Sequence, residues 1–79
     1  KIMTLDILTP DKQLFEGEAT YVGIPGTDGS LGILSNHAPL VTTLRLGEIV
    51  VKTANEELTF EVKGGTVEVL NNHVTILAQ

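Results

Sequence analysis

The sequence predicts an all-β domain, a sandwich or barrel built from short strands. Several short segments alternate apolar and polar residues with a period of two, as strands with one buried face do. Turn-forming residues separate these segments at regular intervals, a spacing typical of sandwiches and barrels. Nowhere do apolar residues recur at spacings of three and four over about a dozen positions, so no amphipathic helix is predicted.

Length and composition limit what the protein can be. We assign the 79 residues to a single domain, residues 1–79, in which 42% hydrophobic residues supply one small core. The sequence has no cysteine, which excludes disulfides and thiolate metal sites. Ten acidic residues outnumber five scattered basic ones, and aromatic residues are few, so nucleic-acid binding is not expected. No apolar run approaches the roughly 20 residues of a membrane span, and we expect no direct membrane insertion.

The first third of the chain is expected to contain two strands and a short segment between them. Residues 2–8 alternate between apolar and polar side chains, which predicts a strand with one buried face. Proline and aspartate in residues 9–12 end this strand in a turn. A short segment, residues 13–15, follows, and we expect a turn at Gly17 to separate it from a strand over residues 18–24.

Residues 23–44 interrupt the alternation. This stretch holds four of the eight glycines and two of the three prolines. Glycine permits positive φ and close backbone approach, and Pro25 and Pro39 each lack a donor for a strand ladder. We therefore expect a shaped loop at the end of a sheet, with a turn at residues 27–29.

The second half of the chain predicts five strands. Residues 40–46 and 48–53 form two of them, and a tight turn at residues 54–56 brings Val51 opposite Leu58 and Ile49 opposite Phe60. Gly64 and Gly65 then break the chain before a hairpin over residues 66–77. A two-residue turn at Asn71 and Asn72 pairs Val69 with Val74 and Val67 with Ile76.

Neither histidine has the neighbouring residues that a metal site or a catalytic site requires. His37 and His73 lie far apart in the sequence, and neither has a second histidine or a carboxylate at metal-ligand spacing. We expect His73 to be a solvated residue of an edge strand and His37 to have a structural or contact role. The glycine spacing lacks the lysine and the helix of a phosphate-binding loop. We therefore expect no catalytic, cofactor-binding or metal-binding residue, and no enzyme.

The chain resembles the epsilon subunit of the F-type ATP synthase over nearly its whole length. The matching motifs occur in order and at the family's spacing: LDILTP at residues 5–10, Phe15-x-Gly17, GxxGxxGI at residues 26–33, HAPL at residues 37–40 with Thr42, GGxVEV at residues 64–69, and NxVTILA at residues 72–78. The resemblance implies a flattened antiparallel sandwich of two small sheets. It also implies a non-catalytic rotor subunit of the central stalk, without a cofactor, that links the gamma subunit to the membrane c-ring. Such a subunit lies on the cytoplasmic face of the bacterial inner membrane or the stromal face in a plastid.

The resemblance also implies contact residues. It places Thr9, His37 and Thr42 near the gamma subunit, and the turn Asp28, Gly29, Ser30 and Leu31 near the c-ring. The family often carries an acid at the position of Ser30, so Asp28 is the nearest charge in this chain. The family's sandwich is followed by a pair of helices that in some members binds ATP. The chain ends at Gln79, where that pair would begin, and we expect it to bind no nucleotide.

A carrier module of the lipoyl or biotinyl kind is the alternative, since those domains are also small, acidic and all-β. The feature in its favour is Lys12, which lies in a turn next to Asp11. Lys12 is near the N-terminus, whereas the carrier pattern places its lysine near the middle of the domain. An adduct on Lys12 in the intact mass would favour the carrier.

Overall fold

Nine strands account for most of residues 2–79, the part of the chain that the computed structural model describes; Lys1, the first residue of the expected domain, lies outside it. These residues contain no helix, as expected. The strands are β1 (Met3–Leu8), β2 (Gln13–Ala19), β3 (Tyr21–Gly26), β4 (Gly29–Ile33), β5 (Leu40–Leu44), β6 (Gly47–Lys52), β7 (Glu57–Val62), β8 (Gly65–Leu70) and β9 (His73–Ala78).

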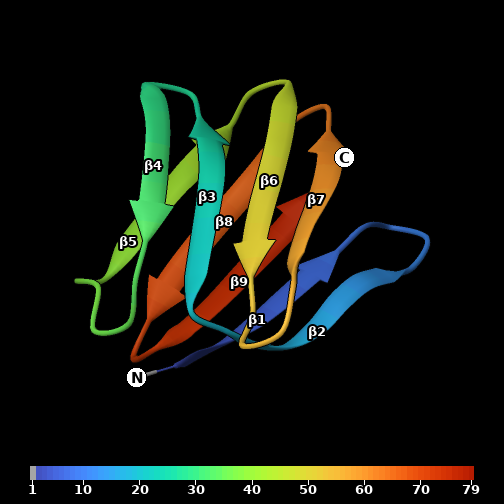
Figure 1. Cartoon of the computed structure of the whole chain (residues 1–79). Coiled ribbons are helices and arrows are strands. Elements are labelled where there is room, and N and C mark those ends of the chain that lie inside the picture. Colours follow the sequence, from blue (N-terminus) through green and yellow to red (C-terminus); the bar gives the residue numbers. More distant parts are fainter. Residues whose placement is uncertain (1) are drawn as a thin grey trace.

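The strands form two layers (Figure 1). One layer, the five-stranded sheet, has the order β2-β1-β9-β8-β5, and the other, the four-stranded sheet, has the order β4-β3-β6-β7. A single residue pair, Gly26 with Leu44, joins β3 to β5 and so links the layers. The expected all-β, sandwich-like fold is confirmed, with two differences. The two sheets are halves of one continuous sheet that curls over at the β3–β5 contact, and β1 and β9 run parallel.

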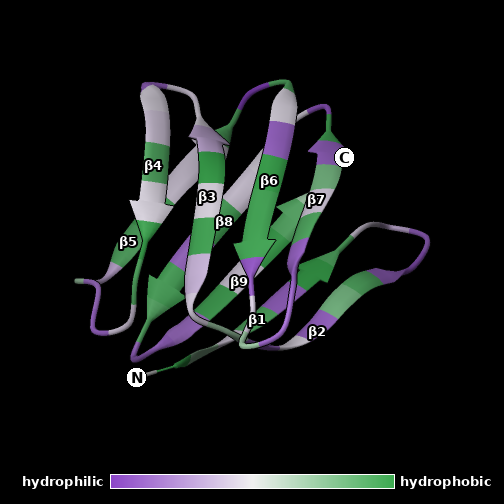
Figure 2. Cartoon of the chain, viewed as in Figure 1, coloured by the Kyte–Doolittle hydropathy of each residue, from purple (hydrophilic) through white to green (hydrophobic). Residues whose placement is uncertain are grey.

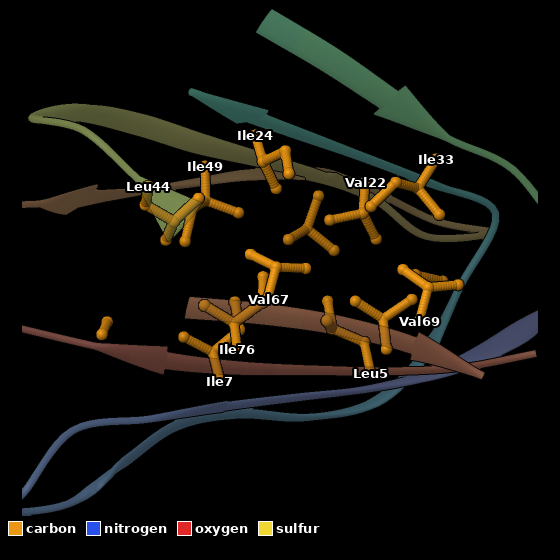
Figure 3. Packing of buried hydrophobic residues seen from close by; sticks show 14 of the residues in the cluster. Leu5, Ile7, Val22, Ile24, Ile33, Leu44, Ile49, Val67, Val69 and Ile76 are labelled. Atoms are coloured by element: carbon orange, nitrogen blue, oxygen red, sulfur yellow. The ribbon is translucent and has the colours of Figure 1, made fainter. Parts of the chain in front are cut away.

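The core lies between the two sheets. Hydrophobic and hydrophilic residues alternate along most strands (Figure 2), so each strand turns one face inward. Figure 3 shows Ile24 and Ile49 of the four-stranded sheet facing Ile76 and Val67 of the five-stranded sheet. Among the described residues, the buried side chains are hydrophobic and none is polar or charged.

Both hairpins predicted in the second half of the chain are confirmed. Across β6 and β7, Val51 pairs with Leu58 and Ile49 with Phe60. Across β8 and β9, Val69 pairs with Val74 and Val67 with Ile76. Asn71 and Asn72 have φ values of 51° and 60°, as a type I′ turn requires of its two central residues.

The expected turn at Gly17 is wrong. Strand β2 continues through Gly17, which pairs with Leu5 of β1. The break comes at Thr20, whose amide and hydroxyl both donate to the carbonyl oxygen of Lys52, at 2.8 and 3.1 Å. Because β2 belongs to the five-stranded sheet and β3 to the four-stranded sheet, the chain must turn at Thr20, where it passes from one layer to the other.

The glycine-rich stretch is a hairpin for much of its length, and not the loop that we expected. Strands β3 and β4 pair through it, and Pro25 pairs with Ser30 inside this ladder. Gly23 and Gly32 face each other across the two strands, and a β-carbon on either would lie 2.9 Å from the side chain of Tyr21. These two glycines therefore make room for an aromatic ring.

Two glycines at positive φ differ in the space around them, so substituting each one measures backbone strain with and without steric overlap. A β-carbon at Gly65 (φ 141°) would lie 2.1 Å from the carbonyl oxygen of Leu77, whereas one at Gly29 (φ 134°) would have no neighbour within 4 Å. We expect Gly29→Ala to lower the free energy of unfolding by roughly 1–2 kcal/mol. Gly65→Ala should lower it by about 3 kcal/mol or more, because the overlap adds to the strain. Urea denaturation measures both, and equal losses would contradict the placement of Gly65.

Candidate functional site

The residues predicted to contact partners fall at opposite ends of the sandwich (Figure 1). The tip of the β3–β4 hairpin, which carries Asp28 and Gly29, lies at the same end as the connection between β5 and β6. His37 lies in the loop between β4 and β5, at the other end, where the β8–β9 turn also lies. The structure therefore describes two candidate contact regions.

The first region is the tip of the β3–β4 hairpin, residues 26–30. Gly26 pairs with Gly29, and Thr27 and Asp28 form the turn between them. A β-carbon on Gly26 would lie 2.6 Å from the carbonyl oxygen of Gly29, so the two strands approach too closely for a side chain there. Asp28, Gly29 and Ser30 are exposed, which brings three of the four predicted ring-contact residues together at the surface.

The fourth residue, Leu31, has a different environment. It pairs with the buried Ile24 and packs against the hydrophobic core, and its side chain is half-buried. Leu31 is thus held by the interior of the sandwich. The exposed apolar side chain at this end is Leu46, in the β5–β6 connection, which is 72% exposed.

The hairpin tip is tied to the neighbouring layer. The amide of Thr27 donates to the carbonyl oxygen of Thr43 at 2.9 Å, and the hydroxyls of these two threonines are hydrogen-bonded to each other. Arg45 donates its amide to the carbonyl oxygen of Pro25 at 2.9 Å and its Nε to that of Gly26 at 3.2 Å. These bonds fix the position of the tip. Sequence reasoning missed Thr43 and Arg45, because their bonds follow from the pairing of β3 with β5.

Thr9 closes the turn after β1. Its hydroxyl donates to the carbonyl oxygen of Lys12 at 3.0 Å and accepts the amides of Asp11 and Lys12 at 3.3 and 3.1 Å. This turn lies at the opposite end of the five-stranded sheet from His37 (Figure 1). Thr9 and His37 therefore do not form one cluster, although the sequence predicted the same partner for both.

Thr42 lies on the inner face of β5. It pairs with the fully buried Val67 of β8 and is itself half-buried. Its neighbour Val41 points outward and is 76% exposed. Along β5, Val41 therefore faces outward and Thr42 faces inward. Thr42 is poorly placed for the predicted contact with a partner.

The outer face of the five-stranded sheet carries exposed apolar side chains. Val41, Leu70 and Leu77, on β5, β8 and β9, are 76%, 47% and 52% exposed. A shallow hollow of about 350 Å³ lies on this face, lined in part by Val41, Glu68 and Leu77. We call Val41, Leu70 and Leu77 the outer apolar group. The sequence analysis did not single them out.

His73 is not the edge residue that the sequence led us to expect. Strand β9 lies between β1 and β8, in the interior of the five-stranded sheet. The Nε2 atom of His73 lies 2.8 Å from a carboxylate oxygen of Asp6, and the histidine side chain is 50% exposed. The parallel pairing of β1 with β9 brings these residues together from positions 67 apart.

Residues 2–79 contain no group of three or more histidine, cysteine, aspartate or glutamate side chains placed to hold a metal ion. Within the same residues, no helix is long and apolar enough to cross a membrane.

A family model described as the ATP synthase delta/epsilon chain, beta-sandwich domain, matches residues 2–79. The ATP synthase epsilon chain of Desulforamulus reducens is 45% identical over 78 residues, which are 99% of this chain and 59% of that protein. That of Thermosynechococcus vestitus is 46% identical over 76 residues, which are 96% of this chain and 55% of that protein. The chain thus spans little more than half the length of these relatives.

Solved structures share the fold. A chain of the Euglena gracilis mitochondrial ATP synthase superposes with a TM-score of 0.91 at 20% identity, over 98% of this chain and 50% of that one. A chain of the central stalk and c-ring of the Tetrahymena thermophila mitochondrial ATP synthase gives a TM-score of 0.83 at 20% identity, over 98% of this chain and 63% of that one.

The two faces of β5 can be distinguished by one substitution at each of two adjacent residues. We expect Thr42→Glu to lower the free energy of unfolding by about 2 kcal/mol or more, because it places a carboxylate without a partner next to buried Val67. Val41→Glu should change it by no more than about 0.5 kcal/mol, since Val41 is on the surface. Urea denaturation of the two variants at neutral pH measures both values. A stable Thr42→Glu variant would contradict the inward placement of Thr42.

Proposed function

Because this chain belongs to the ATP synthase delta/epsilon β-sandwich family, we propose that it is the sandwich domain of a non-catalytic rotor subunit of an F-type ATP synthase. In this role residues 1–79 form one domain that links the gamma subunit to the c-ring and couples ion translocation to ATP synthesis. The subunit lies on the cytoplasmic face of the bacterial inner membrane or the equivalent stromal face. The relatives named ATP synthase epsilon chain support this proposal.

The gamma subunit, we propose, lies across the outer face of the five-stranded sheet. Thr9 and His37 are at opposite ends of this sheet, so a partner that contacts both must cross the face between them. The observation that carries this proposal is the outer apolar group: all the large hydrophobic side chains that are exposed within the described strands belong to it. An interface of at least roughly 1,000 Å² with an apolar centre fits such a surface.

The c-ring, we propose, contacts the hairpin tip through Asp28, Gly29 and Ser30, with Leu31 supporting them from below. Exposed ion pairs contribute only about 0–1 kcal/mol each, so Asp28 alone cannot define the contact. The shape of the tip, which Gly29 sets and the bonds from Thr43 and Arg45 maintain, is the main determinant. A rotor element must transmit torque, and a braced tip deforms less than a free loop.

A charge in the outer apolar group tests the gamma contact. We expect Val41→Glu to weaken binding to the purified gamma subunit by about tenfold or more, because it places a carboxylate in the apolar centre of the interface. Thr59→Glu is the matched control, since Thr59 is exposed on β7 in the other sheet. Isothermal titration calorimetry measures both affinities. If the two variants bind gamma equally well, the partner does not cover this face.

The shape of the hairpin tip can be tested separately from its polar groups. We expect Gly29→Val to uncouple the ring from the shaft more severely than Ser30→Ala, because a branched side chain at φ 134° distorts the tip. The sandwich should still fold, since the space around Gly29 is open. ATP-driven proton pumping in reconstituted vesicles compares the two variants. Equal pumping, or a larger loss with Ser30→Ala, would refute the role of shape.

A further inference from the structure

Two asparagines from distant turns bind each other at the end of the sandwich that carries His37. The side-chain oxygen of Asn72 accepts the backbone amide of Asn36 at 2.5 Å. The side-chain nitrogen of Asn72 donates to the side-chain oxygen of Asn36 at 3.2 Å. We call this pair of hydrogen bonds the asparagine clasp. It joins the β4–β5 loop to the β8–β9 turn across 36 positions of sequence.

The clasp is anchored in the five-stranded sheet. The carbonyl oxygen of Asn72 accepts the amide of Thr4, in β1, at 2.9 Å. Asn72 therefore connects three segments: strand β1, the β8–β9 turn and the loop that carries His37. Within that loop the chain makes one further turn, in which the amide of His37 donates to the carbonyl oxygen of Leu34 at 3.2 Å.

Asparagine suits both positions for two separate reasons. Asn36 and Asn72 have φ values of 65° and 60°, a left-handed conformation that asparagine tolerates better than most residues with a side chain. The side-chain amide also combines an accepting oxygen with a donating nitrogen, and the clasp uses both atoms of Asn72. At position 72, glycine would tolerate the positive φ but could not form the clasp. Aspartate would keep the accepting oxygen and lose the donating nitrogen.

We propose that Asn72 is a positioning residue for the contact segment His37–Pro39. It holds that segment in place before the partner arrives, so that binding does not have to order the loop. This inference rests on the proposed function, in which the gamma subunit contacts His37. The hydrogen bonds of Asn72 to this loop go to Asn36, the residue directly before the segment. Its neighbour Asn71, which is exposed, makes no part of the clasp.

Hydrogen exchange tests the clasp without any partner. In the 79-residue chain, we expect Asn72→Gly to speed exchange of the Asn36 amide by about tenfold or more, because that amide loses its acceptor. Asn71→Gly is the matched control, since it makes the same replacement at φ 51° in the same turn, and it should leave that exchange rate unchanged. Asn72→Asp should restore most of the protection, because the carboxylate still accepts the amide. An unchanged rate in Asn72→Gly would overturn the inference, whatever the chain binds.

Affinity for the gamma subunit tests the positioning role. We expect Asn72→Gly to bind gamma about fivefold or more weakly than Asn71→Gly, and Asn72→Asp to recover most of the difference. Faster exchange with an unchanged affinity would overturn the positioning role while leaving the proposed function in place. A parent chain that fails to bind gamma would overturn the proposed function, and the positioning role with it. If Asn72→Gly does not fold, Asn36→Gly replaces it. This variant removes only the side-chain half of the clasp and keeps the bond to the backbone amide. We therefore expect a smaller loss of affinity, about twofold, and an unchanged affinity would overturn the positioning role.

Discussion

The packing of two sheets against one thin apolar layer is the constraint on which the rest of this molecule depends. Each buried aliphatic side chain contributes roughly 1.5–3 kcal/mol, whereas a domain of this size has a net stability of only about 5–10 kcal/mol. Strand β9 alone places Val74, Ile76 and Ala78 in that layer. A shift of one residue in its register would turn these three side chains outward and remove most of the net stability. Contacts with other molecules are therefore confined to the outer faces and the two ends.

Features that depend on neighbouring residues could be predicted from the sequence. The β8–β9 register followed from the turn at Asn71 and Asn72 together with the alternation on either side of it. The exposed residues of the hairpin tip, Asp28, Gly29 and Ser30, lie together for a similar reason, because they are consecutive in the chain. The expected turn at Gly17 failed because the glycine is used inside a ladder, and the change of layer at Thr20 depends on strands that are distant in sequence.

The surfaces were harder to predict than the strands. Alternation along β5 groups Thr42 with Leu40 and Leu44, but only the pairing of Thr42 with Val67 shows that this face lies inside the sandwich, away from any partner. Likewise, the bonds from Thr43 and Arg45 to the hairpin tip exist only once β3 lies next to β5. The side-chain contact between Asp6 and His73 forms only because β1 lies parallel to β9. Each of these depends on topology, which local spacing does not encode.

That parallel contact also bears on how the chain reaches its native state. Thr4 pairs with His73, so the centre of the five-stranded sheet cannot close until both β1 and β9 are available. During synthesis on the ribosome, β1 and β2 must wait as an isolated hairpin while every later strand emerges, and a lone hairpin is only marginally stable in water. Structures dominated by such non-local pairings fold in roughly milliseconds to seconds, slower than helical bundles of the same size. The side of β1 that later pairs with β9 is open throughout that interval, and an unpaired strand edge of this kind can pair with other chains.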